Sequence, residues 1–65
     1  MKISINGVWK SVTAENLESI LNEAGYRELR VATAVNGNFV PVERRAGFQI
    51  EEGDQLEVLA PRQGG

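Results

Sequence analysis

The first twelve residues alternate between apolar and polar side chains. Ile3 and Ile5 are separated by polar neighbours, and the alternation then reaches Asn6-Gly7. Asn-Gly is the pair that best tolerates the positive φ angles of a type I′ turn between antiparallel strands. We therefore predict a β-hairpin over residues 1–12.

The apolar spacing then changes to that of a helix. Four apolar residues recur at i, i+3, i+4 and i+7, namely Leu17, Ile20, Leu21 and Ala24. They predict a helix of about three turns with one apolar stripe. Thr13 is its expected N-cap, and Gly25 is the expected left-handed residue after its C-terminus.

Strand character returns around a second Asn-Gly pair, Asn36-Gly37, which predicts a second hairpin. Val31, Thr33 and Val35 are expected on one face of its first strand, and Ala32 and Ala34 on the other. Proline ends the second strand at Pro41, because it cannot donate to the ladder.

The rest of the chain predicts a loop and one more strand. Residues 42–50 are expected to form a loop or irregular turn, and "EEGD" at 51–54 predicts a turn. In the last strand Leu56 and Val58 alternate with polar residues, and Pro61 is expected to close it.

The predicted order is ββαβββ, the order that an α+β fold of the β-grasp, ubiquitin-like type requires. We expect a mixed sheet of about four or five strands with one helix across one face. Residues 1–60 form the predicted domain, and residues 61–65 are predicted to be a flexible C-terminal tail.

One helix can cover only one face of this sheet, so part of the other face must meet solvent or a partner. If Asn6-Gly7 is a two-residue loop, Ser4 lies opposite Trp9, and Trp9 points away from the face that holds Ile3 and Ile5. Leu59 has the same relation to the apolar residues of the last strand. Each either covers the sheet edge, fills a shifted core or contacts a partner.

Composition narrows the possible functions. The chain has 65 residues, enough for one small domain, and contains no cysteine and no histidine. Disulfides and a structural zinc site are therefore not expected. Nine acidic residues against seven basic ones make nucleic acid and anionic membranes poor partner candidates. Without a membrane-spanning stretch or a secretion signal, the expected location is cytoplasmic.

The folded body offers no evident catalytic equipment. Without histidine, no imidazole can activate its serine and threonine hydroxyls. The carboxylates of the 51–54 turn are expected to serve solubility, and Arg44-Arg45 to lie in a solvated loop. We therefore expect no catalytic residue, no metal and no bound cofactor, and a protein that is not an enzyme.

The chemistry is expected at the end of the chain, "PRQGG". Two residues without side chains, Gly64 and Gly65, can enter a channel too narrow for any Cβ. The carboxyl group at Gly65 is an anion at neutral pH and a poor electrophile. Another protein must activate it, and attack on the α-phosphate of ATP is the expected route.

The whole chain resembles the sulfur-carrier protein of thiamine (thiazole) biosynthesis, in the ubiquitin-like β-grasp superfamily. The stretches that carry the resemblance are "AVNGNFVP" at 34–41, "EEGDQLEVLAP" at 51–61 and "QGG" at 63–65.

The resemblance implies that an E1-like adenylyltransferase consumes ATP to adenylate the Gly65 carboxylate. A persulfide donor then supplies sulfur for a thiocarboxylate, and thiazole synthase accepts that sulfur. Gly64 and Gln63 are the tail residues expected to be needed for threading, and Leu59 and Arg62 are candidate partner contacts. The chain is thus expected to be a carrier and a co-substrate.

Three other interpretations stay open. The small subunit of molybdopterin synthase uses the same tail, although its chains are usually longer. A protein modifier would pass the activated carboxyl group to a lysine of a target. A non-covalent β-grasp binding module would have incidental glycines.

Overall fold

The structure is a computed structural model that describes residues 1–26 and 30–60. Its elements follow one another as β1 (Lys2–Ile5), β2 (Val8–Ser11), α1 (Leu17–Glu23), β3 (Ala32–Val35), β4 (Asn38–Val40), the 3-10 helix η1 (Val42–Gly47) and β5 (Gln55–Leu59). The predicted order ββαβββ is confirmed.

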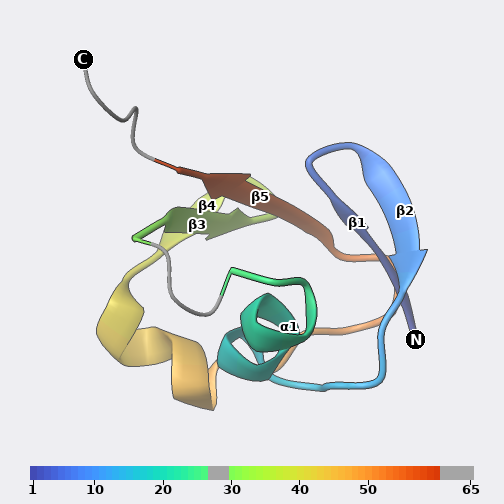
Figure 1. Cartoon of the computed structure of the whole chain (residues 1–65), viewed down its shortest axis with the longest axis horizontal. Helices are drawn as coiled ribbons and strands as arrows, with labels where there is room; N and C mark the ends of the chain where they lie inside the picture. The colour runs from blue at the N-terminus through green and yellow to red at the C-terminus, as the bar shows by residue number, and fades with distance from the viewer. Residues whose placement is uncertain (27–29, 61–65) are drawn as a thin grey trace.

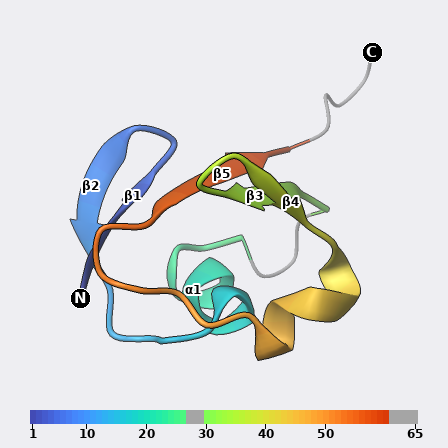
Figure 2. The same ribbon diagram turned by 180° about the vertical axis from the view of Figure 1, so that it is seen from behind.

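The five strands form one mixed sheet in the order β2-β1-β5-β3-β4. β1 pairs with β2, and β3 with β4, as antiparallel hairpins. β5 lies between the hairpins, parallel to β1 and antiparallel to β3. In Figures 1 and 2, α1 crosses one face of this sheet. The predicted fold class, α+β of the β-grasp type, is confirmed.

Both hairpins turn on an Asn-Gly pair with nearly the same backbone. Asn6 and Gly7 have φ angles of 52° and 85°, and Asn36 and Gly37 have φ angles of 51° and 85°. Positive φ at both central residues defines a type I′ turn, which matches the twist of the flanking strands. Both predicted hairpins are therefore confirmed.

The core lies between α1 and the sheet face that it covers. Its fully buried members come from β1, α1 and β5, while the second hairpin and the connecting segments close its sides. The buried apolar residues are Ile3, Ile5, Val12, Leu17, Ile20, Leu21, Val35, Val40, Ile50, Leu56 and Val58. In the described part of the chain, no helix is long and apolar enough to cross a bilayer.

The helix begins later than the sequence predicts. Asn16, not Thr13, is its N-cap, and the Asn16 side-chain oxygen accepts a hydrogen bond from the Ser19 N–H at 2.8 Å. α1 spans seven residues, which is about two turns rather than three. Ala24 is exposed at its C-cap and does not extend the buried stripe, whereas Gly25 follows with the expected positive φ of 95°.

A tertiary pairing causes the late start. The segment before the helix lies antiparallel to the segment that follows η1. The Leu17 N–H donates to the Phe48 carbonyl at 2.9 Å, and the Ile50 N–H donates to the Glu15 carbonyl at 2.8 Å. These bonds hold the chain extended at positions that the periodicity assigns to the first helical turn.

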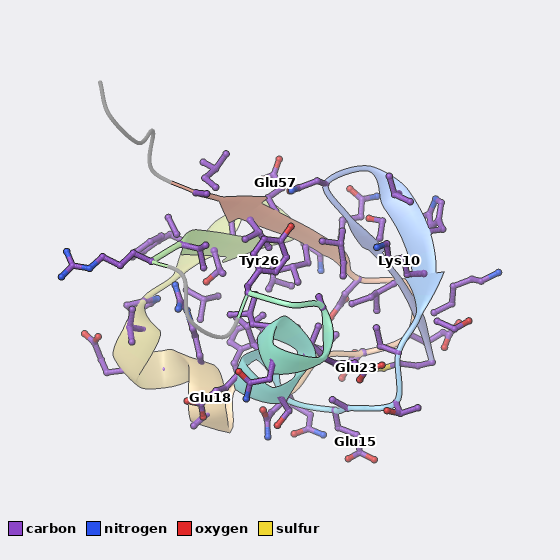
Figure 3. The ribbon with its side chains drawn as sticks, viewed as in Figure 1. Lys10, Glu15, Glu18, Glu23, Tyr26 and Glu57 are labelled. Atoms are coloured by element: carbon purple, nitrogen blue, oxygen red, sulfur yellow. The ribbon has the colours of Figure 1, made fainter. Side chains whose placement is uncertain are left out.

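Glu23 holds Thr13 in place. Its carboxylate accepts hydrogen bonds from the Ala14 N–H at 3.0 Å, the Thr13 N–H at 3.2 Å and the Thr13 hydroxyl at 3.1 Å. The Ala14 bond, followed by those from Thr13, lowers the pKa of Glu23 below its ordinary value. Figure 3 shows Glu23 on the α1 side of the molecule.

The segment expected to be an irregular loop is η1, which begins directly after Pro41. Arg45 in η1 is not a solvated loop residue, contrary to expectation. Its guanidinium donates to the Thr33 hydroxyl at 3.2 Å and also to the Val31 carbonyl. The buried Thr33 hydroxyl in turn donates to the Val40 carbonyl at 2.8 Å. Arg45 therefore ties η1 to the second hairpin.

The Glu23 contact predicts a pH-dependent stability. Because folding lowers the pKa of Glu23, its contribution is present above the unfolded pKa and is lost as pH falls through the folded pKa. Glu23→Gln should therefore lower the melting temperature at pH 7, and the difference from the wild type should shrink below about pH 4. Thermal unfolding followed by circular dichroism across this pH range measures both. A constant difference at every pH would contradict the assigned role.

Arg45→Met should lower the free energy of unfolding by about 1–3 kcal/mol, because it leaves a buried hydroxyl and a carbonyl without their donor. The neighbouring Arg44 is exposed and is the matched control, so Arg44→Met should change stability by less than about 0.5 kcal/mol. Urea denaturation measures both values. Equal effects of the two substitutions would show that the Arg45 bonds do not stabilise the fold.

Candidate functional site

Of the sequence-predicted site residues, Leu59 lies in the described part of the chain. β5 alternates strictly, with Leu56 and Val58 buried against α1 and Leu59 70% exposed on the other side. The other four, Arg62, Gln63, Gly64 and Gly65, lie outside the described residues, as do Pro61 and the predicted tail. The structure thus places the strand that leads to the predicted tail.

The face of the sheet opposite α1, here called the outer face, carries the other candidate contacts. Trp9 lies opposite Ser4, as predicted, and Ser4 is paired with Gln55 of β5. Trp9 is 53% exposed, so it does not fill the core. The period-two alternation of the strands then places these three side chains on the outer face.

Phe39 joins this face, although the sequence patterns did not single it out. It is paired with Ala34 and is 69% exposed. The Asn36-Gly37 turn carried the signal, because a two-residue loop places Ala34 opposite Phe39, and Ala34 was expected on the face opposite Thr33 and Val35. Trp9, Phe39 and Leu59, which we call the outer apolar residues, therefore come from β2, β4 and β5.

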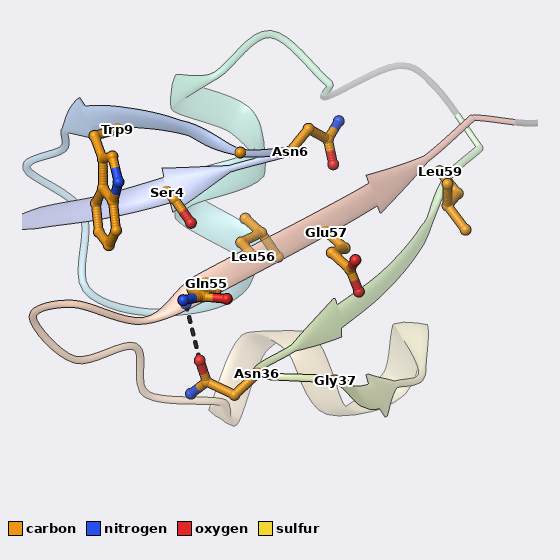
Figure 4. Close-up of a pocket in the computed structure, with 10 residues that line it drawn as sticks. Ser4, Asn6, Trp9, Asn36, Gly37, Gln55, Leu56, Glu57 and Leu59 are labelled. Carbon is orange, nitrogen blue, oxygen red and sulfur yellow. Dashed lines mark hydrogen bonds between the residues drawn. The ribbon is translucent and has the colours of Figure 1, made fainter.

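A hollow of about 760 Å³ opens on the outer face between the two hairpin turns. Ser4, Trp9, Gln55, Glu57 and Leu59 are among the residues that line it. Figure 4 shows Ser4, Gln55 and Glu57 on this side of the sheet, with α1 behind it. Ser4 is only 4% exposed, so its hydroxyl is a polar point in the floor of the hollow.

The charge of the hollow is acidic. Glu57 is the ionisable residue among the described residues that line it. In Figure 3, Glu57 stands on the outer face, whereas Glu15 and Glu18 lie on the α1 side. A partner surface that covers the outer face would thus meet apolar side chains together with one carboxylate.

Both Asn-Gly turns hold β5 through asparagine side chains. The Asn6 side chain accepts from the Val58 N–H at 2.8 Å and donates to the Val58 carbonyl at 3.1 Å. The Asn36 side chain accepts from the Gln55 N–H at 3.0 Å. The two turns therefore fix opposite ends of the strand that leads to the predicted tail.

The acidic turn before β5 has a structural role beyond the expected solubility. One Asp54 carboxylate oxygen accepts from the Glu51 N–H at 2.8 Å, and the other accepts from the Asn36 side chain at 3.0 Å. Glu52 accepts from the Lys2 N–H at 3.0 Å. Among residues 1–26 and 30–60, no group of three or more acidic side chains is arranged to hold a metal ion.

The comparison with family models decides the family. The model of the ThiS family matches residues 3–65. The chain belongs to the ThiS family. The expected ubiquitin-like sulfur-carrier type is thereby confirmed.

Solved structures agree with this assignment. The crystal structure of the thiamine biosynthesis protein ThiS from Geobacter metallireducens is 26% identical, with a TM-score of 0.83 and full coverage of both chains. An NMR solution structure of a thiamine biosynthesis protein from the same organism is 23% identical, with a TM-score of 0.80, and covers 100% of this chain and 88% of that one. At that identity the second match supports the fold alone. A comparison with curated protein sequences finds no match.

Within the ThiS-family fold, the described residues provide two features for a carrier. β5 supplies a strand that is paired with β1 at Gln55 and Leu56 and with β3 as far as Leu59, just before the predicted tail. The outer face supplies exposed apolar side chains around an acidic hollow.

Proposed function

We propose that this protein carries sulfur for thiazole formation in thiamine biosynthesis, with the Gly65 carboxyl group as the site of activation. The observation that carries the proposal is the ThiS family match over residues 3–65. The full-length likeness to a structure named as a thiamine biosynthesis protein supports the pathway.

In the proposed reaction, a Gly65 carboxylate oxygen attacks the α-phosphorus of ATP, and pyrophosphate leaves. The product is an acyl adenylate held by an E1-like adenylyltransferase. A persulfide sulfur then attacks the acyl carbon, and AMP leaves. A thiol reduces the resulting acyl disulfide and releases the thiocarboxylate. Thiazole synthase accepts the sulfur from this group.

The carrier contributes the length of its C-terminal segment and the absence of side chains at its last residues. Six residues follow Leu59 in the sequence, and in extended form six residues span up to about 20 Å. Gly64 carries no side chain, so the walls of a partner's channel can approach its backbone closely. Gln63 and Arg62 provide polar groups before the glycines. This arm would bring the acyl carbon to each partner's active site in turn.

The outer apolar residues are the proposed docking contacts. Exposed aromatic and aliphatic side chains with polar neighbours are typical anchors of protein interfaces. Leu59 lies six residues before Gly65, so a partner that holds it also limits where the tail can go. Docking and threading would thus be one event.

The direct test is intact mass spectrometry of the protein after incubation with ATP, an activating enzyme and a persulfide donor. The mass should change by the replacement of one oxygen with one sulfur, and fragmentation should place the change at Gly65. An isopeptide adduct on a lysine would instead identify a protein modifier.

Gly64→Ala and deletion of Gly65 serve as variants for the same assay. Both should abolish the mass change, while melting temperatures stay within about 2 °C, because neither residue is expected to pack in the core. The ThiS from Geobacter metallireducens is the positive control. Conversion of that control without conversion of this protein would refute the proposal.

Leu59→Ser should raise the KM for the carrier in the activation reaction by about tenfold, because a fully desolvated interface contact contributes roughly 1–2 kcal/mol. Its melting temperature should hardly change, since the side chain is exposed. Val42→Ser is the matched control, because Val42 is similarly exposed but lies in η1 rather than on the outer face. Equal KM values for the two variants would contradict docking through Leu59.

A further inference from the structure

We propose that Asn6 is a positioning residue, which fixes the direction in which the chain leaves β5 and so presents residues 60–65 to the activating enzyme. The inference rests on the proposed function, because it concerns how the carrier's end reaches a partner. Asn6 itself touches no reacting group in this scheme.

The first support is that Asn6 makes three hydrogen bonds to β5. Its backbone N–H donates to the Leu56 carbonyl at 2.9 Å. Its side-chain amide accepts from the Val58 N–H at 2.8 Å and donates to the Val58 carbonyl at 3.1 Å, both in partly buried positions. The side chain thus pairs with Val58 as a peptide group of a neighbouring strand would.

The second support is that β1 cannot make this pairing with its own backbone. β1 ends at Ile5, and the φ of 52° at Asn6 turns the main chain away into β2. The paired residues of the parallel ladder are Ser4 with Gln55 and Ile5 with Leu56. The Asn6 amide therefore adds one hydrogen-bonded pair, here called the Asn6 rung, beyond the end of β1.

The third support is that the Asn6 rung lies near the C-terminal end of β5. On its other side β5 is paired with β3 as far as Leu59. Without the Asn6 amide, the part of β5 after Leu56 would be held from the β3 side alone, and a strand bonded along one edge can pivot about that edge. Val58 lies just before Leu59 and Ala60, where the described chain stops.

A fixed exit direction matters because threading costs conformational entropy. An arm that starts from a fixed strand end samples fewer wrong directions, so less of the binding energy is used to order it. The effect should appear in the KM for the carrier. The kcat should stay the same, because the carboxyl group and its activation are unaltered.

Asn6→Gly distinguishes the side-chain hydrogen bonds of Asn6 from its role in the turn. Glycine adopts a positive φ without strain, so the hairpin is retained while the side-chain bonds to Val58 are lost. Asn36→Gly makes the same change at the other turn, where the bond to Gln55 is lost. Glu23→Gln weakens the stabilising hydrogen bonds from Thr13 and Ala14, far from β5, and controls for loss of stability alone.

The first measurement is amide hydrogen exchange of the free protein. Asn6→Gly should speed exchange at Val58 by about fivefold and leave Gln55 unchanged, since each lost hydrogen bond contributes roughly 1 kcal/mol. Asn36→Gly should instead speed exchange at Gln55 and leave exchange at Val58 unchanged. Unchanged Val58 exchange in Asn6→Gly would overturn the inference at its structural step.

The second measurement is ATP–pyrophosphate exchange with the activating enzyme, over a range of carrier concentrations. Asn6→Gly should raise the KM for the carrier by about three- to tenfold with kcat unchanged, whereas Glu23→Gln should leave both at the wild-type values. If Asn6→Gly does not fold, Asn6→Asp should also raise the KM for the carrier, because its carboxylate can accept from the Val58 N–H but cannot donate to the Val58 carbonyl.

The outcomes separate the two proposals. A normal KM for Asn6→Gly, with an active wild type, overturns the positioning role and leaves the proposed function intact. An equal rise in KM for Glu23→Gln overturns it as well, because general destabilisation would then explain both variants. No exchange with the wild type, where the Geobacter ThiS is active, overturns the proposed function and the inference with it.

Discussion

The fold depends on one strand that is paired on both sides. Each hairpin closes on itself through its own Asn-Gly turn, and β5 joins the hairpins into one sheet by pairing with β1 and β3. The same strand places Leu56 and Val58 in the core under α1. Because β5 leads directly to the predicted tail, the interactions that hold the sheet together also set where a carried group would start.

The second constraint is that few elements are present to cover the two faces of the sheet. In the described residues α1 covers one face of the sheet, and the connection through η1 runs beside it rather than over the outer face (Figures 1 and 2). Exposed single apolar side chains are ordinary in proteins. Among the described residues, Trp9, Phe39 and Leu59 share the face that α1 leaves uncovered, which is the face proposed for docking.

Local sequence signals correctly predicted the features that depend only on residues close together in the sequence. The Asn-Gly turns set the hairpin registers, and the alternation in the last strand placed Leu59 on the outer face, because both effects act over a few residues. Thr13 failed as a predicted N-cap because a remote segment at 48–50 pairs with the chain just before α1. The same kind of long-range contact ties the partly buried Arg45 to Thr33 and Val31.

The sequence by itself determined the element order, the two turns, the apolar faces and the resemblance to a sulfur carrier, since these follow from side-chain type and spacing along the chain. Only the tertiary structure decided that Asn6 pairs with Val58, that Asn16 caps the helix and that Phe39 joins Trp9 and Leu59. Those outcomes depend on which distant segments become neighbours in the fold. No local sequence pattern identifies the distant group to which a side chain will hydrogen-bond.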